Sequence, residues 1–134
     1  MDFSQLDTVK ASEHTSELTV LHPVTGEETD VTIRVYGSQS DAVKKFGERM
    51  LRKMQKQELE NNRSRKPKFR EIDELQADAI ESVLVRIAGW ENMQWAGKEL
   101  EFTEENARMV LTQCPWLREQ VIEHSEDLGN YLKA

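Results

Sequence analysis

The chain has 134 residues, of which 37% are hydrophobic and 32% charged, and its net charge is -7. This length is enough for one hydrophobic core and too short for two ordinary domains. The single cysteine, Cys114, excludes an intrachain disulfide, and no segment approaches the roughly 18 consecutive apolar residues of a membrane-spanning helix. The N-terminus lacks the basic start and apolar run of a signal peptide. We therefore expect a cytoplasmic chain that does not enter a membrane.

Charge is distributed in three blocks. Residues 1–43 and 71–134 are both acidic, whereas residues 44–70 carry eleven basic and three acidic side chains. A basic segment between acidic flanks can be neutralised within the chain or by head-to-tail association of copies. The charge pattern therefore favours contact of the basic segment 44–70 with an acidic surface of this chain or of another copy.

The first elements are a loose leader over residues 1–16 and a β-hairpin over residues 17–37. The leader is polar and has no hydrophobic period. In the hairpin, two runs of alternating apolar residues flank the turn residues 23–26, a pattern typical of paired strands; the apolar positions are Leu18, Val20, Val31, Ile33 and Val35. An isolated hairpin is only marginally stable in water, so its apolar face must pack on other elements.

A long charged helix is predicted over residues 40–63. The segment Ser38–Asp41 offers two N-cap candidates, Ser38 and Ser40, and Asp41 places an acid near the positive end of the helix dipole. The apolar positions form a narrow stripe that can bury one seam only, and they are Val43, Phe46, Met50 and Met54, with Leu51 and Leu59 beside them. Residues 64–70 follow as an exposed, mobile basic connector, because Pro67 disfavours continuous helix.

Residues 71–134 are expected to form a helical core. The first helix has the densest apolar face and should end near Gly89; the face comprises Ile72, Leu75, Ala79, Ile80, Val83, Leu84 and Ile87. An irregular loop or short hairpin with Trp90 and Trp95 comes next. Thr103 is a strong N-cap for a short helix, and Pro115 can open the last one. The predicted fold is mainly α with an N-terminal β-hairpin (α+β), with about four helices in a single domain over residues 17–134.

The sequence carries no recognisable catalytic or metal-binding pattern. His14, His22 and His124 lack the spacing of metal ligands, and the sequence contains no glycine-rich phosphate loop or Gly-x-Ser-x-Gly motif. Cys114 with His124 as its base is one interpretation, and a small buried side chain before a turn is the favoured one. We expect no enzyme activity, no cofactor and no metal.

The basic segment 44–70 allows three interpretations. A nucleic-acid contact would use its arginines and lysines, but the aromatic side chains needed for stacking are nearly absent. A solvated surface is the second. Contact with a protein is favoured, because a thin stripe containing methionines suits adaptable helix packing. The expected partner-binding residues are Phe46, Met50 and Met54 for apolar or self contact, and Lys45, Arg49, Arg52 and Lys53 for electrostatic docking.

The three tryptophans also allow two interpretations. Trp90, Trp95 and Trp116 are either interface anchors, or, for two of them, side chains that pack the loop onto the last two helices. The second is favoured because such large side chains bury much apolar area.

Several segments resemble the tail assembly chaperones of long-tailed bacteriophages. They are Leu18–Gly26, Val35–Ser38, the Trp-Glu-Asn loop with the Thr-capped helix over 90–108, and Pro115–Val121. The similarity covers most of residues 18–124, omits the basic connector, and rests on the order of elements more than on any one motif.

The resemblance implies a non-enzymatic assembly factor. Such a protein binds and solubilises the tape measure protein in the host cytoplasm, helps recruit tail tube subunits, commonly self-associates, and is absent from the mature virion. Two alternatives remain open at this point. One is a small nucleic-acid-binding or regulatory protein that uses residues 44–70, and the other is a structural tail connector.

Overall fold

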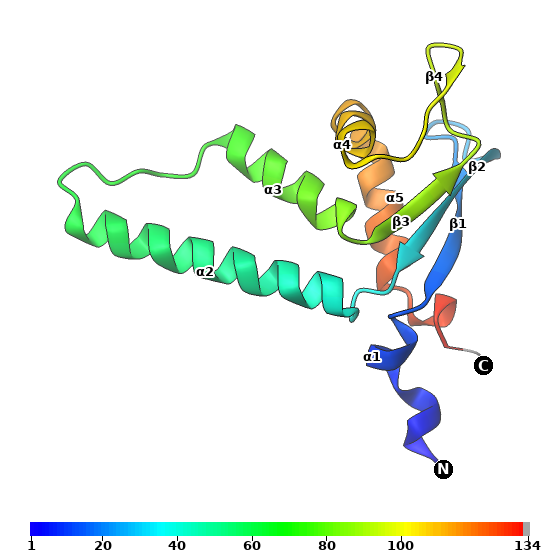
Figure 1. The fold of residues 1–134 in the computed structure, drawn as a ribbon, viewed down its shortest axis with the longest axis horizontal. Helices are drawn as coiled ribbons and strands as arrows, with labels where there is room; N and C mark the ends of the chain where they lie inside the picture. Colours follow the sequence, from blue (N-terminus) through cyan, green and yellow to red (C-terminus); the bar gives the residue numbers. More distant parts are fainter. Residues whose placement is uncertain (133–134) are drawn as a thin grey trace.

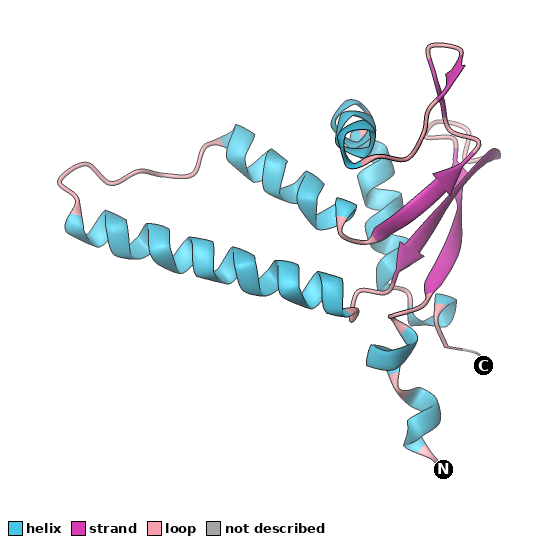
Figure 2. Cartoon of the chain, in the orientation of Figure 1, coloured by secondary structure: helices cyan, strands magenta, loops and turns pink. Residues whose placement is uncertain are grey.

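The computed structural model describes residues 1–132 and confirms the predicted α+β class. A three-stranded antiparallel sheet is covered on one face by helices, and a long helical hairpin extends away from it (Figures 1 and 2). The elements in chain order are η1 (Phe3–Leu6), α1 (Thr8–Ala11), β1 (Thr15–Leu21), β2 (Glu28–Tyr36), α2 (Asp41–Arg63), α3 (Ile72–Leu84), β3 (Ile87–Glu91), β4 (Gln94–Trp95), β5 (Lys98–Glu99), α4 (Glu104–Gln113), α5 (Pro115–Glu126) and η2 (Leu128–Asn130).

The predicted N-terminal hairpin is present. Strands β1 and β2 pair antiparallel from Thr15↔Tyr36 to Leu21↔Glu28, with an irregularity between Thr19 and Leu21. Gly26 lies in the connecting turn at φ +73°, in the left-handed region that favours glycine. The alternation of apolar residues thus predicted both the strands and their buried face.

The third strand was not predicted, and the expectation of one helix continuing to Gly89 was wrong. Helix α3 ends at Leu84, and residues 87–91 pair with β2 through Ile33↔Trp90 and Val35↔Ile87. The run from residue 83 to residue 90 is rich in apolar and β-branched residues, which suit a buried strand as well as a helix. Pairing with β2 decides the outcome, because it supplies partners for the backbone groups on the second edge of β2.

The leader expected over residues 1–16 also differs from its prediction. Residues 3–6 and 8–11 form short helical turns capped by Asp2 and Asp7, and β1 begins at Thr15. Ser12 is buried, and the amide of Gly37 donates to its carbonyl oxygen at 3.1 Å. A polar sequence without a period gave no indication of these contacts with the chain after β2.

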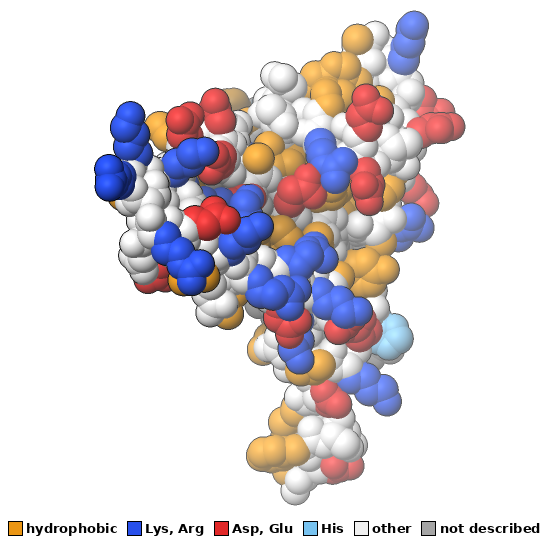
Figure 3. All heavy atoms as spheres, turned by 60° about the vertical axis from the view of Figure 1, so that its left-hand side comes forward, with side chains coloured by type: hydrophobic (Ala, Val, Ile, Leu, Met, Phe, Trp, Pro, Cys, Tyr) orange, Lys and Arg blue, Asp and Glu red, His pale blue; other side chains and the backbone are white. Residues whose placement is uncertain are grey.

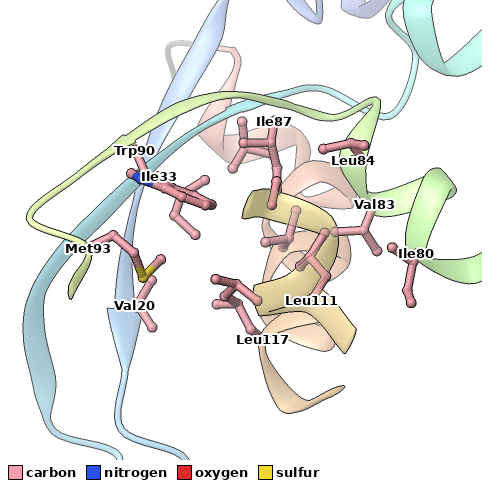
Figure 4. Close-up of a cluster of buried hydrophobic side chains, with 14 residues drawn as sticks. Val20, Ile33, Ile80, Val83, Leu84, Ile87, Trp90, Met93, Leu111 and Leu117 are labelled. Carbon is pink, nitrogen blue, oxygen red and sulfur yellow. The ribbon is translucent and has the colours of Figure 1, made fainter. Parts of the chain in front are cut away.

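The core lies between one face of the sheet and helices α3, α4 and α5 (Figure 4). Only the last part of α3 contributes to it. The buried side chains are Val20, Ile33, Val35, Ile80, Val83, Leu84, Ile87, Trp90, Met93, Ala107, Val110, Leu111, Leu117 and Val121.

Helix α5 is attached to the hairpin by polar side chains. The carboxamide of Gln120 both accepts from the Leu21 amide and donates to the Leu21 carbonyl, each at 2.9 Å. Ser125 Oγ donates to the Tyr36 carbonyl at 2.8 Å, and His124 Nε2 lies 3.0 Å from Ser16 Oγ. The bonds of Gln120 and Ser125 satisfy backbone groups of the hairpin, and together with the contact of His124 they fix α5 against β1 and β2.

Substitution of the central core leucine tests this packing. Leu111→Ala is expected to lower the free energy of unfolding by about 2–5 kcal/mol, because the residue is only 1% exposed and its removal leaves a cavity. The matched control is Leu59→Ala on α2, where the side chain is 52% exposed, and the change should stay within about 0.5 kcal/mol. Urea unfolding followed by circular dichroism measures both, and equal losses would contradict this core.

The contact of His124 with the hairpin makes stability depend on pH. Burial lowers the pKa of His124 in the folded protein, so the neutral ring is favoured there. The unfolded chain takes up the proton near pH 6.5, so this residue should destabilise the fold as the pH falls below about 6.5. His124→Gln keeps a group that can bond to Ser16 but cannot titrate. Urea titrations at several pH values should show a weaker pH dependence for this variant, and identical pH profiles would refute the prediction.

Candidate protein-binding arm

Helix α2, the connector 64–70 and the first turns of α3 form a helical hairpin, here named the arm (residues 41–79). It extends from the body of the molecule, and α2 has no buried residue over its 23 positions (Figure 1). Basic side chains gather along it (Figure 3). The partly covered positions of α2 lie on one face, toward the connector and α3, and the rest of the helix is exposed to solvent.

The base of the arm is fixed by the N-terminal segment. Ser40 is the N-cap of α2, as expected, and the Asp41 amide donates to the Glu13 carboxylate. Gly37 lies directly against Ser12, since a Cβ at position 37 would clash with Ser12 Oγ. Residues 12–13 therefore hold the start of α2, and no side chain is tolerated at Gly37 without displacement.

The tip of the arm is closed by polar contacts. The carboxamide of Asn61 accepts from the Lys68 amide at 2.9 Å and donates to the Lys68 carbonyl at 2.6 Å. Asp78 of α3 pairs with Lys53 of α2 at 3.2 Å and also with Arg70 of the connector. Asp78 and Arg70 are each largely shielded from water, with side chains 19% exposed, so this pairing is screened less than a surface ion pair.

The predicted partner-binding residues all lie on α2, where the structure separates them into two groups. Phe46 and Met50 are half-buried, while Met54 is 53% exposed, and their spacing of four places them on one side of the helix. Among the cations, Arg49 lies over the Phe46 ring at 5.8 Å, a cation–π contact. Arg52 is exposed on the same helix.

Two of the predicted docking cations are engaged within the chain. Lys45 pairs with Asp41 at 2.9 Å, and that hydrogen bond raises the pKa of Lys45 above its ordinary value. Lys53 contacts Asp78 and helps to close the arm. The sequence spacing did not distinguish Lys53 from Arg52, because Asp78 belongs to another element.

The arm also exposes large apolar side chains that the prediction did not assign to a binding surface. Leu51 and Leu59 on α2 are 57% and 52% exposed, whereas Phe69, Ile72 and Leu75 of the connector and α3 are 84%, 80% and 50% exposed. Apolar groups gathered on one projecting element are typical of an interaction surface. The helical spacing of Ile72 and Leu75 predicts that they belong to the core face of α3, and this is wrong, because the buried residues of α3 begin at Ile80.

The alternative of a Cys114 nucleophile with His124 as base is wrong. Cys114 precedes α5 and His124 lies near its other end, ten positions later, a rise of about 15 Å along a helix. Burial raises the pKa of the Cys114 thiol, which disfavours the reactive thiolate. His124 instead contacts Ser16.

Of the tryptophans, Trp90 packs the loop onto the core. Its Nε1 donates to the Leu100 carbonyl at 2.8 Å, and its ring meets Phe102 edge-on at 5.0 Å. Trp116 is half-buried against the same core, while Trp95 on the β4–β5 hairpin is 39% exposed. Of the two earlier interpretations, packing thus applies to Trp90 and Trp116.

Residues 1–132 contain neither a metal-binding cluster nor a membrane-spanning helix. No group of three or more His, Cys, Asp or Glu side chains is arranged to hold a metal ion there. No helix in that range is long and apolar enough to cross a membrane.

Loss of Asp78 tests how the arm is closed. Asp78→Ala is expected to increase tryptic cleavage after Lys68 and Arg70 several-fold, because both the connector and α2 lose their shared carboxylate partner. The unfolding midpoint should change little, since the core does not include this residue. The control Glu60→Ala removes an exposed acid of the same arm and should leave cleavage unchanged. Equal cleavage of wild type and Asp78→Ala would show that these contacts do not order the connector.

A family model described as YdaY prophage protein matches residues 38–134. The matched range begins just before α2 and includes the arm and helices α3, α4 and α5, and it excludes the β1–β2 hairpin. No curated protein and no solved structure matches the chain.

Proposed function

Because the chain belongs to the YdaY prophage protein family, we propose that it serves a phage as a non-catalytic tail assembly chaperone. In this proposal it binds and solubilises the tape measure protein and helps to recruit tail tube subunits. It acts in the host cytoplasm and is left out of the mature virion. The specific role comes from the sequence resemblance described above, and the family supports its phage origin.

The observation that carries the proposal is the exposed amphipathic arm. Its stripe of Phe46, Met50 and Met54 is incompletely covered by the rest of the chain. Methionine side chains are flexible and polarisable, so they adapt to many apolar helix faces without a unique fit. This chemistry suits a chaperone that must contact a long helical client at many places.

Charge on the arm supports the same function. Arg49 and Lys56 lie to one side of the stripe on α2, whereas Arg52 lies on the opposite side of the helix, near Leu59. Cations flanking an apolar seam can pair with acids on the client helix and set its direction, although each exposed pair contributes only about 0.2–1 kcal/mol. Binding energy should therefore come chiefly from the apolar stripe.

Co-expression with the tape measure protein of the same prophage tests the proposal. Wild type should increase the soluble fraction of that protein and co-purify with it. The double variant Met50→Asp, Met54→Asp should lose both effects, because it places charges in the apolar contact. Unchanged solubility of the tape measure protein with the wild-type chain would refute the proposal.

The control is Leu59→Asp, which puts one carboxylate, in place of the two of the test variant, on the opposite side of α2 at a site 52% exposed. It should keep the wild-type effect. If this variant also failed to solubilise the tape measure protein, the loss would be due to the added negative charge on the helix and not to the stripe. Circular dichroism of all variants confirms that the arm remains helical.

A nucleic-acid-binding function is the second candidate, favoured by the exposed cations of α2 and the connector. Phosphate-driven binding must weaken steeply as salt rises. A gel shift at two salt concentrations distinguishes the functions, since contact through the apolar stripe should survive the higher one.

A further inference from the structure

A groove of about 770 Å3 lies between α3 and α5. The apolar side chains that form its floor are those of Ala79, Val83, Pro115 and Ile122. Leu75 and Ile72 continue this floor outward along α3, because they precede Ala79 by four and seven positions and therefore share its side of the helix. The result is a continuous apolar strip along α3 from Val83 to Ile72, about 16 Å long at the rise of an α-helix.

The outer part of this strip is not covered by the rest of the chain. Ile72 and Leu75 are 80% and 50% exposed, and Ala79 is exposed as well. Helix α2 contacts α3 at Asp78, which points about 100° away from Ala79 around the helix. None of the described residues that line the groove belongs to α2. The strip is therefore a surface separate from the stripe of α2.

Carboxylates border the groove along α5. They are Glu119, Glu123, Glu126 and Asp127, and Arg118 is the one basic residue among the described lining residues. The three glutamates follow one another at spacings of four and three, so they lie along one side of α5 beside the floor. This border attracts a cationic ligand and repels an acidic one.

The walls of the groove are α-helices, whose backbone groups are bonded within each helix. A chain bound there meets side chains and no free strand edge, so its own amides and carbonyls must be bonded internally. A helix meets this requirement and an extended segment does not. The apolar strip corresponds to about three turns of such a helix.

We infer that the groove between α3 and α5 binds an amphipathic helix of another protein, one whose apolar stripe is flanked by lysines or arginines. The stripe of that helix rests on the floor and on Leu75, and its cations pair with Glu119 and Glu123. This is a second binding surface of the protein. It does not depend on the proposed contact of α2 with the tape measure protein.

The test uses the full-length protein and a synthetic helix as the probe. The probe is a fluorescein-labelled peptide of about 14 residues, with leucines at spacings of three and four and lysines on both sides of them. A second peptide carries glutamate at every lysine position. Fluorescence anisotropy should show binding of the cationic peptide and binding at least about tenfold weaker of the acidic one. Affinity for the cationic peptide should fall as salt rises from about 0.1 M to about 1 M, where the Debye length falls from about 10 to about 3 Å.

Reversal of charge on the border tests the location. The groove variant Glu119→Lys, Glu123→Lys should bind the cationic peptide about tenfold more weakly than wild type, because two attractive contacts become repulsive. Both glutamates are exposed, so the fold should tolerate the change. The control Glu27→Lys, Glu28→Lys makes the same change of net charge at the hairpin turn and should bind as wild type.

Two further variants exclude misfolding and test the floor. Arg118→Glu removes the basic residue of the lining and should strengthen binding several-fold, which loss of structure cannot do. Leu75→Ala should weaken binding several-fold, because it shortens the apolar strip. Its matched control is Leu59→Ala, since Leu59 is 52% exposed on α2 and lies outside the groove; this variant should bind as wild type.

Three results would overturn the inference. They are a wild-type protein that does not bind the cationic peptide, equal binding of the acidic peptide, and undiminished binding by the groove variant. Sedimentation equilibrium tests a second copy of the chain as the occupant, and a molar mass that falls in the groove variant would assign the groove to that copy instead. Solubilisation of the tape measure protein is measured separately with the stripe variant, so failure of either proposal is recognised without reference to the other.

Discussion

The structure depends on one small core in which the hairpin and the C-terminal helices bury each other. Ile33 and Val35 of β2, Leu111 of α4 and Val121 of α5 are almost completely removed from water. Neither half could do this alone, because a two-stranded hairpin leaves its apolar face in water and a pair of short helices leaves its apolar stripe there. The burial of these apolar side chains therefore holds the hairpin and the C-terminal helices together.

The arm is a consequence of how the chain leaves and re-enters this core. It leaves at the end of β2, where Gly37 packs on Ser12, and it returns at Ile80, the first buried residue of α3. Everything between is held at its base by Glu13, joined between its helices by Asp78 and closed at its tip by the contacts of Asn61 with Lys68. The arm is therefore an anchored helical hairpin with an amphipathic surface, which is the property that both proposed contacts require.

The two proposals place two binding surfaces of opposite charge on one chain. On α2, a stripe with methionines tolerates different apolar partners, while the cations beside it select acidic surroundings. The groove between α3 and α5 is bordered by carboxylates and selects a cationic helix. The membership of the YdaY prophage protein family covers both surfaces, since the matched residues 38–134 include α2, α3 and α5.

The sequence by itself determined the features that depend on residues only a few positions apart. The alternation of Ile33 and Val35, the caps Ser40 and Thr103 and the proline that opens α5 predicted the hairpin and the starts of three helices. The stripe of Phe46, Met50 and Met54 was likewise found from its spacing, because residues four apart share a helix face. These features depend on neighbours a few positions away, so no knowledge of the fold is needed to find them.

Tertiary structure alone decided the features that bring distant residues together. Residues 87–91 became a strand because β2 had an unpaired edge, not because their own pattern excluded a helix. Asp78 became the closure of the arm because α3 returns beside α2, and the groove exists because α3 meets α5. Hydrogen bonding and charge pairing between separate elements depend on their arrangement in space, which a hydrophobic period along the chain does not contain.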